Sequence, residues 1–304
     1  MDSADVLQAI TTADGSPTFF SGRFQETFHS RAGALAESRQ TFIDQAALDA
    51  WPRGHRLTVL DCCYGLGYNG AALWDALTEQ RPDLGLCWLG LELDLSIAAA
   101  ALEDGAFRCQ WRPSVLQRLR AIASASCWEE SPAPGQAPST GRLLAGDARR
   151  QLPLLQQLSG RVDVILHDPF SPPRCPELWT VECIGALARL LSPRGRLITY
   201  SRAAALRTAL LQAGLQLGSI PPRHPRGWSD GSVASPAALP LGLSLMEREH
   251  LGTRAAVPYR DPCLSDSSGE ILRRRAAEQR HSPLEATGAW RRRWRPWLEG
   301  RART

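Results

Sequence analysis

The chain has 304 residues and a formal net charge of +4, with 43% hydrophobic and 22% charged residues, as in a globular protein with a sizeable core. No apolar run approaches the roughly 20 residues that span a bilayer, and the acidic start MDSADVLQ lacks the basic and apolar parts of a signal peptide. The eight cysteines form no CxxC pair and no zinc-type Cys/His spacing. We therefore expect a cytoplasmic protein with reduced thiols, no membrane segment and no metal.

Short apolar runs alternate with helical patterns through the middle of the chain. The runs have the length of β-strands, and they lie within residues 56–61, 86–94, 142–152, 162–168 and 195–201. The intervening patterns, such as AALWDALTEQ and AAALRTALLQAG, have helical character. This alternation predicts βαβ units and a mostly parallel sheet, and runs that are apolar on both faces predict helices on both sides. We therefore predict an α/β fold, doubly wound and Rossmann-like.

The same pattern divides the chain into parts. Residues 51–220 hold the strand–helix alternation, and residues 1–50 form a cap segment in front of it. Residues 124–141 are small and rich in proline, which predicts a surface insertion in the core. Residues 221–304 lose the rhythm, and we expect an extension that completes the sheet with a final strand and one or two helices. The sequence gives no indication of the oligomeric state.

Arginine and tryptophan are concentrated at the C-terminus, in WRRRWRPWLEGRART. All 35 basic residues of the chain are arginines. Arginine beside aromatic residues can bind phosphates and stack on bases, so Arg291, Arg292 and Arg293 are candidate substrate-binding residues. The alternative interpretation is an exposed amphipathic helix whose tryptophans dock on the body of the protein.

Four of the predicted strands have an acidic residue at or just beyond their carboxyl ends. These residues are Asp61, Glu92, Asp147 and Asp168. Open parallel sheets bind ligands beyond the carboxyl ends of their strands, near the point where the strand order reverses. The sequence therefore predicts a shared cleft that is rich in hydrogen-bond acceptors.

A glycine-rich turn, DCCYGLGYNG, follows the first predicted strand. Its glycine spacing also matches the fingerprint for a dinucleotide, so the spacing alone leaves the cofactor open. A carboxylate at Asp61 would repel a pyrophosphate, whereas it suits the cationic methionyl part of S-adenosylmethionine. We therefore predict S-adenosylmethionine as the cofactor, in contact with Gly65, Gly67 and Asn69. Glu92 would accept hydrogen bonds from its ribose hydroxyls and Asp147 from its adenine amino group.

Four segments carry a resemblance to a known family: DGSPTFFSGRFQETFHSRAGALAES, GLGYN, VDVILHDPFSPPRCPELWT and RLITYSRAAALRTALLQAGL. Together they resemble the MnmC-like family of tRNA methyltransferases, from about Thr12 to Ile220. Cys63 departs from the pattern, because methyltransferases commonly have the first glycine of the loop there. The family's basic segment after QAGL is also missing, and no counterpart of the flavin-binding oxidase half is recognisable.

The resemblance implies a methyl acceptor, the primary amine of 5-aminomethyl-uridine, often 2-thiolated, at the wobble position of tRNA. An ammonium group cannot attack a methyl group, and Asp168 in the proline-rich segment could receive its proton. Phe170 could stack on an extruded uracil, with the prolines holding both side chains rigid. The structural alternative for Asp168 is a cap at the end of a strand. The family's N-terminal segment covers the active site, which makes His29 and Glu37 candidate substrate-binding residues.

Two other functions are compatible with these features. A polyamine synthase shares this fold and uses an acidic cleft for amines, although it typically has a three-glycine loop. A non-catalytic RNA-binding relative could also retain the fold. Neither which tRNAs are used nor the source of the aminomethyl group can be inferred from the sequence.

Overall fold

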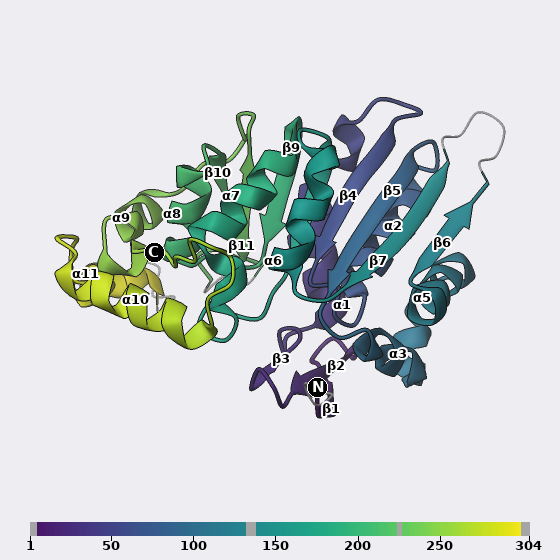
Figure 1. Ribbon diagram of the computed structural model, residues 1–304, viewed down its shortest axis with the longest axis horizontal. Helices are drawn as coiled ribbons and strands as arrows, with labels where there is room; N and C mark the ends of the chain where they lie inside the picture. Colours follow the sequence, from purple (N-terminus) through teal and green to yellow (C-terminus); the bar gives the residue numbers. More distant parts are fainter. Residues whose placement is uncertain (1–4, 132–137, 224–226, 299–304) are drawn as a thin grey trace.

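A computed structural model describes residues 5–131, 138–223 and 227–298 of the chain. Its main sheet has the strand order β10-β11-β9-β8-β4-β5-β7-β6, with helices on both faces (Figure 1). Its parallel strands are β4 (Arg56–Cys62), β5 (Gly85–Glu92), β7 (Ser139–Ala145), β8 (Val162–His167) and β9 (Leu191–Thr199). Its antiparallel strands are β6 (Cys127–Glu130), β10 (Gln216–Ile220) and β11 (Gly231–Ser235). The predicted doubly wound, mostly parallel α/β fold is confirmed.

The order of the strands reverses at β4. From β4 the chain continues to β5 and β7 on one side, and later to β8 and β9 on the other. At this point the carboxyl ends of β4 and β8 lie side by side, because Cys62 pairs with His167 and the Asp168 amide donates to the Cys62 carbonyl over 3.1 Å. A reversal of this kind leaves a crevice at the carboxyl edge of a parallel sheet. Asp61 and Asp168 therefore belong to the same edge.

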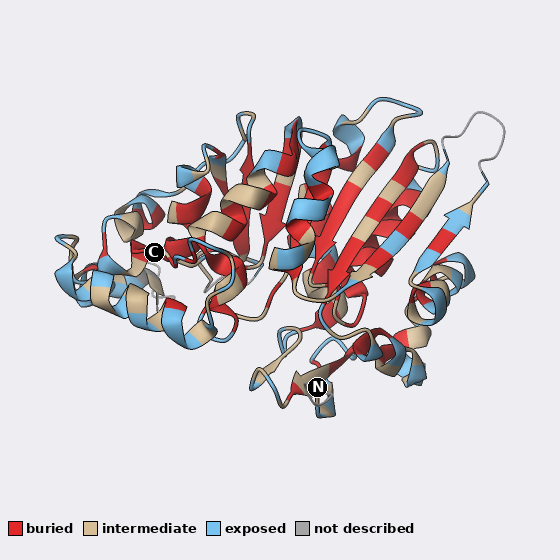
Figure 2. Cartoon of the chain, in the orientation of Figure 1, coloured by how far each residue is buried: buried red, intermediate tan, exposed pale blue. Residues whose placement is uncertain are grey.

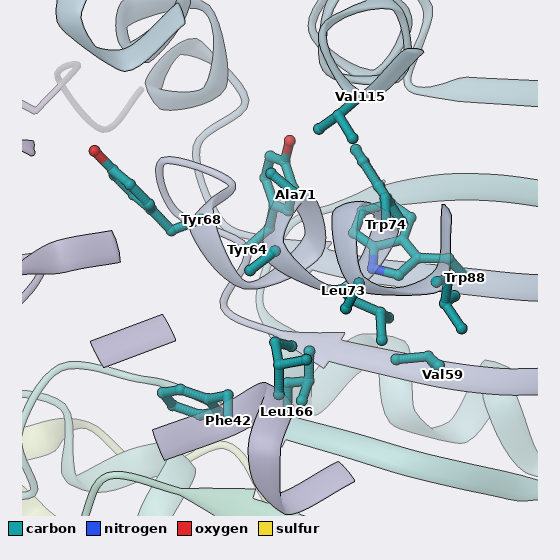
Figure 3. Close-up of a cluster of buried hydrophobic side chains, with 14 of the residues drawn as sticks. Phe42, Val59, Tyr64, Tyr68, Ala71, Leu73, Trp74, Trp88, Val115 and Leu166 are labelled. Atoms are coloured by element: carbon teal, nitrogen blue, oxygen red, sulfur yellow. The ribbon is translucent and has the colours of Figure 1, made fainter. Parts of the chain in front are cut away.

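Two apolar cores cover the two faces of the sheet. The first packs against α2 (Tyr68–Gln80), α3 (Ser96–Glu103), α4 (Gly105–Arg108) and α5 (Pro113–Ala125). Figure 3 shows part of it, with Trp74 of α2 beside Trp88 of β5, their ring centroids 5.2 Å apart. The second core packs against α6 (Ala148–Gln151), α7 (Val181–Leu190) and α8 (Ala204–Gln212). The central strands are accordingly almost entirely buried, as Figure 2 shows.

The N-terminal segment forms a small sheet of its own. It contains β1 (Leu7–Thr11), β2 (Pro17–Ser21) and β3 (Glu26–Thr27), followed by α1 (Ala34–Glu37). Two contacts fix it against the carboxyl edge of the main sheet: the Ser171 amide donates to Glu26 Oε2 over 2.8 Å, and the Tyr68 hydroxyl donates to the Pro17 carbonyl over 2.8 Å. Figure 1 shows this segment below the ends of β4 and β5. It therefore forms one wall of the crevice.

The proline-rich stretch 124–141 differs from a simple surface insertion. Its two ends form a hairpin, in which β6 pairs with β7 and extends the edge of the sheet. Trp128 of β6 packs edge-on against Trp74, and Arg118 lies over its indole ring. Trp128, which is flanked by polar residues, anchors an edge strand. The proline content of this stretch concealed the strand in the sequence. Residues 132–137 lie outside the described residues.

The C-terminal extension contributes a strand and then three helices. β11 lies between β9 and β10 in the sheet, and α9 (Leu245–Leu251), α10 (Ser268–His281) and α11 (Thr287–Leu298) follow, one helix more than expected. A buried pair joins the extension to the core, because Arg207 of α8 donates to Glu247 of α9 over 2.8 Å. Trp290 of α11 is buried and stacks on His250, with ring centroids 4.1 Å apart. The extension is therefore packed on the body of the protein.

Candidate active site

The turn between β4 and α2 has a backbone that only glycine tolerates easily. Cys63, Gly65 and Gly67 have φ values of 71°, 55° and 88°, in the left-handed region. A Cβ atom on Gly67 would lie 2.5 Å from the Tyr64 hydroxyl oxygen, so no other residue fits there without a shift. Cys63 takes the conformation that the family pattern assigns to a glycine. The sequence departure at Cys63 therefore leaves the shape of the turn intact.

Glu92 closes this turn from the end of β5. Its Oε2 accepts a hydrogen bond from the Gly65 amide over 2.7 Å, and its Oε1 accepts one from the Asp94 amide over 3.0 Å. The side chain is only 7% exposed, and this burial raises the pKa of Glu92 although the two amides oppose the shift. Each oxygen retains acceptor capacity beyond its amide partner. Glu92 can therefore still accept hydrogen bonds from a pair of hydroxyl groups.

Two adjoining hollows lie at this edge of the sheet. The larger has a volume of about 690 Å³ and extends from Glu92 to Asp147. The smaller has a volume of about 100 Å³ and includes Asp168 and Phe170. Both are lined by Cys63 and Glu92, so they meet at the glycine turn. Small-molecule sites commonly have volumes of about 300–1,000 Å³, which includes the larger hollow.

Asp147 begins α6 at the far end of the larger hollow. Its Oδ1 accepts from the Arg149 amide over 2.9 Å, and its Oδ2 accepts from Arg149 Nη2 over 2.8 Å. Burial by itself would raise the pKa of Asp147, but the hydrogen bonds and charge of Arg149 outweigh it and hold the pKa below its usual value. Asp147 is therefore an ionised acceptor in a fixed orientation.

Asp168 lies where the smaller hollow meets the end of β8. Its Oδ2 accepts from Asn69 Nδ2 over 2.8 Å, and Asn69 Oδ1 accepts from the Ser38 hydroxyl over 2.8 Å. Burial raises the pKa of Asp168 well above its usual value, and the charge of Glu37 raises it further. Asn69 thus holds the carboxylate rather than standing apart as a separate cofactor contact. The arrangement gives Asp168 a fixed orientation and an increased affinity for a proton.

Asp61 is completely buried in β4. Its side chain is 0% exposed, and neither carboxylate oxygen has a hydrogen-bond partner among the described residues. Burial above all raises the pKa of Asp61 to about 8, with a smaller contribution from the charge of Glu92. A buried polar group without a partner is uncommon, and such groups are found where function requires them. Asp61 is not among the residues that line the two hollows, and with a pKa of about 8 its side chain is mostly the neutral acid at pH 7.

The burial of Asp61 has a consequence for stability. Between about pH 4 and pH 8 the unfolded chain ionises this carboxyl group while the folded chain keeps it protonated, so stability decreases as the pH rises. The side chain in Asp61→Asn cannot ionise. We therefore expect the free energy of unfolding of this variant, relative to that of the parent, to be larger at pH 8 than at about pH 4. Denaturant unfolding of both ligand-free proteins at the two pH values tests this. An equal difference in unfolding free energy between variant and parent at both pH values would contradict the burial of an ionisable Asp61.

Phe170 belongs to a group of three aromatic rings. The ring of Phe24 stacks on it, with centroids 4.4 Å apart and planes at 19°, and Phe28 meets it edge-on at 4.9 Å. Trp179 Nε1 donates to the Phe170 carbonyl over 2.8 Å and fixes the backbone. All three phenylalanines line the smaller hollow. Phe24 and Phe28 were not singled out in the sequence, because they lie more than 140 residues before Phe170.

The cap segment places the two other candidates differently. His29 contacts Thr18 over 3.1 Å and the ring of Tyr68, and burial lowers the pKa of His29 to about 4, so it is neutral at pH 7. It is not among the residues that line either hollow. Glu37 accepts from the Ser30 amide over 2.8 Å, and burial raises the pKa of Glu37. The charge of Glu37 raises the pKa of Asp168, although Glu37, like His29, is not among the residues that line the two hollows.

The arginine-rich helix α11 lies away from the hollows, at the side of the molecule with α9 and α10 (Figure 1). Arg291 and Arg292 are exposed. Arg293 donates to Glu285 over 2.9 Å twice and to Glu249 over 2.9 Å. Trp294 Nε1 also donates to Glu249. The side chain of Trp297 lies outside the described residues. Arg293 is thus held by two carboxylates, whereas Arg291 and Arg292 face solvent.

In the described residues, no helix is long and apolar enough to span a membrane. The same parts of the chain contain no group of three or more His, Cys, Asp or Glu side chains placed to hold a metal ion.

Comparisons with known proteins identify the family of the chain. Residues 133–226 match a family described as S-adenosyl-L-methionine-dependent methyltransferase. The chain is 32% identical over 257 residues to the tRNA 5-methylaminomethyl-2-thiouridine biosynthesis bifunctional protein MnmC of Methylibium petroleiphilum, covering 76% of this chain and 38% of that one. It is 29% identical to the protein of that name from Acidovorax sp., covering 70% and 33%. The chain thus spans about a third of the length of these relatives.

Solved structures give the same result. The structure of MnmC2 from Aquifex aeolicus superposes with a TM-score of 0.77 at 26% identity, over 92% of this chain and 87% of that one. Spermidine synthase from Thermotoga maritima superposes with a TM-score of 0.50 at 12% identity, over 79% and 72%, which indicates a shared fold alone.

The fold, the glycine turn and these matches define an S-adenosylmethionine-dependent methyltransferase. The cavity fits its cofactor, since Glu92, Cys63 of the glycine turn and a second carboxylate, Asp147, line a hollow of suitable size. Within this class, the chain is an MnmC-like methyltransferase.

Proposed function

We propose that the protein methylates the aminomethyl nitrogen of wobble uridine in tRNA, converting 5-aminomethyl-uridine or its 2-thio form to the 5-methylaminomethyl product. One observation carries this proposal. Asp168 lines the smaller hollow together with three aromatic rings, beside the larger hollow, and its surroundings raise the pKa of its carboxyl group. The names of the related proteins point to the same modification.

The acidic surroundings suit an ammonium group. Asp168 and Glu37 would attract the protonated amine, and the free Oδ1 of Asp168 would receive its proton because Asn69 already occupies Oδ2. A carboxylate with a raised pKa accepts a proton from an ammonium more readily than an ordinary one. The neutral nitrogen then forms its bond to the methyl carbon as the bond between that carbon and sulfur breaks. S-adenosylmethionine supplies the methyl group and leaves as S-adenosylhomocysteine.

The three phenylalanine rings suit a base that is flipped out of its stack. An extruded uracil can be held on an aromatic face, and each stacked base contributes about 1–3 kcal/mol. Phe24 covers one face of Phe170, so we assign the uracil to the surface that Phe170 and Phe28 leave toward the smaller hollow. The hydrogen bond from Trp179 and the surrounding prolines hold this surface in place.

Arginines at the rim of the larger hollow and on α11 suit the phosphates of tRNA. Arg150 and Arg174 are exposed and line the hollow. We expect Arg150→Gln with Arg174→Gln to raise the KM for tRNA by about tenfold and to leave kcat nearly unchanged, because phosphate contacts position the RNA without entering the chemistry. Arg291→Gln with Arg292→Gln should act in the same direction. Steady-state kinetics and the salt dependence of tRNA binding test both pairs, and salt slopes equal to the parent's would contradict the phosphate contacts.

Nucleoside analysis of tRNA from a strain without the protein is the decisive experiment. We expect 5-methylaminomethyl-uridine to disappear and its unmethylated precursor to accumulate. The purified protein should restore the modification with S-adenosylmethionine. Intact modification in the deletion strain, or transfer from decarboxylated S-adenosylmethionine to putrescine in vitro, would instead favour a polyamine synthase.

A further inference from the structure

The C-terminal extension reaches the cofactor hollow through one arginine. Arg149 lies two residues after Asp147 and uses its guanidinium in two directions. Nε and Nη2 donate to the Asp147 carboxylate, with the shorter contact at 2.8 Å. Nη1 donates to Asp261 Oδ2 over 2.8 Å and to the Asp266 carbonyl over 2.9 Å. Asp261 and Asp266 belong to the segment between α9 and α10.

Asp261 is built as a fixed anchor. Its side chain is 0% exposed, and its Oδ1 accepts from the amides of Ser265 and Asp266 over 3.0 and 3.1 Å. Its own amide donates to Glu182 at the start of α7 over 2.8 Å. Every contact of this carboxylate thus comes from its own loop or from Arg149. Removing either charge of a buried ion pair is costly, so the orientation of the Asp261 carboxylate is strongly determined.

The same segment borders the hollow. Ser268, the first residue of α10, lines it, and its hydroxyl donates to Glu177, which also lines the hollow. Asp147, Arg149 and Ser268 therefore line the same hollow. The C-terminal extension contributes to the end of the larger hollow that we assign to adenine. In the sequence, this part of the chain lies far from the glycine turn.

We propose that Arg149 is a positioning residue, which transmits the fixed orientation of Asp261 to Asp147 and thereby makes recognition of the adenine amino group depend on the C-terminal extension. The inference rests on the proposed contact between Asp147 and adenine, and it is independent of the methyl acceptor. The amide, Nε and Nη2 of Arg149 occupy three of the roughly four acceptor positions of the Asp147 carboxylate, which leaves one for an amino group. Without the anchor, Arg149 can turn away and Asp147 loses its fixed direction.

Binding of two product analogues tests this relay by calorimetry. The probes are S-adenosylhomocysteine and its hypoxanthine analogue, in which a carbonyl oxygen replaces the amino group. A hydrogen bond to a charged acceptor is worth about 1.5–3 kcal/mol, so the parent should prefer adenine by at least about tenfold. Asp147→Ala should abolish the preference, because it removes both acceptor oxygens, and Asp261→Asn should reduce it at least about threefold. A merely structural Asp261 would change the melting temperature and leave the preference as it is.

A matched control lies in the same segment. Arg260 donates to Glu182 Oε1 over 2.6 Å, whereas the Asp261 amide uses Oε2, and no hydrogen bond joins Arg260 to Arg149 or Asp147 in the described residues. Arg260→Gln therefore loosens the segment and leaves the contacts of Arg149 in place. It should keep the parent's preference. If Asp261→Asn destabilises the fold too far, the double variant Arg149→Gln with Asp261→Asn removes both charges and should show the same reduced preference. An unchanged preference in Asp147→Ala overturns the adenine contact, and an unchanged preference in the Asp261 variants overturns the relay. Both outcomes are independent of any test with tRNA.

Discussion

Asp168→Asn is expected to lower kcat by about 100-fold or more while the affinity for S-adenosylhomocysteine stays close to the parent's. The substitution keeps the shape and the partner Asn69 but removes the proton acceptor and its negative charge. Because burial and the charge of Glu37 raise the pKa of Asp168, the parent's activity should fall as the pH drops, and at a higher pH than an ordinary aspartate would give. The variant should lose this acid limb.

Single-turnover rates at several pH values, with calorimetry for the cofactor, make this measurement. Asn69→Ala provides a graded companion, because it removes the hydrogen bond to Asp168 Oδ2 and leaves the carboxylate present. We expect its loss of rate to be smaller than that of Asp168→Asn. A fully active Asp168→Asn protein at neutral pH would remove Asp168 from the mechanism.

The parallel strands and the glycine turn could be predicted because their signals are local. Apolar runs of five to nine residues bounded by turn residues identify β4, β5, β8 and β9 within a few positions. Gly65 and Gly67 of the predicted turn have a left-handed φ, which glycine adopts readily. Asp168 and Glu92 could be placed at one edge because carboxyl ends of parallel strands meet there. Local sequence patterns therefore predict most of the fold and half of the candidate site.

The remaining features depend on contacts between distant segments. Phe24 and Phe28 reach Phe170 only because the cap sheet folds over the edge, and no periodicity in the sequence indicates this. Asp61 was expected to face the cleft, whereas β4 carries it into the interior. The hairpin of β6 was concealed by prolines that belong to its connection. Arg149 joins Asp147 to Asp261 across 112 positions of the sequence, a distance at which only the fold decides.

Glu92→Gln is expected to weaken binding of S-adenosylhomocysteine by about 10- to 100-fold, since charge-assisted hydrogen bonds contribute about 1.5–3 kcal/mol. The carboxylate accepts the amides of Gly65 and Asp94 on separate oxygens, and glutamine must turn an NH₂ group toward one of them. The variant thus loses an acceptor for the ribose hydroxyls and also loosens the glycine turn. Calorimetry measures the dissociation constant. Glu79→Gln is the matched control, because this exposed glutamate of α2 pairs with Arg112 and does not line the hollow, and its variant should bind as the parent does. Equal affinities for the Glu92 and Glu79 variants would mean that Glu92 supports the turn without contacting the cofactor.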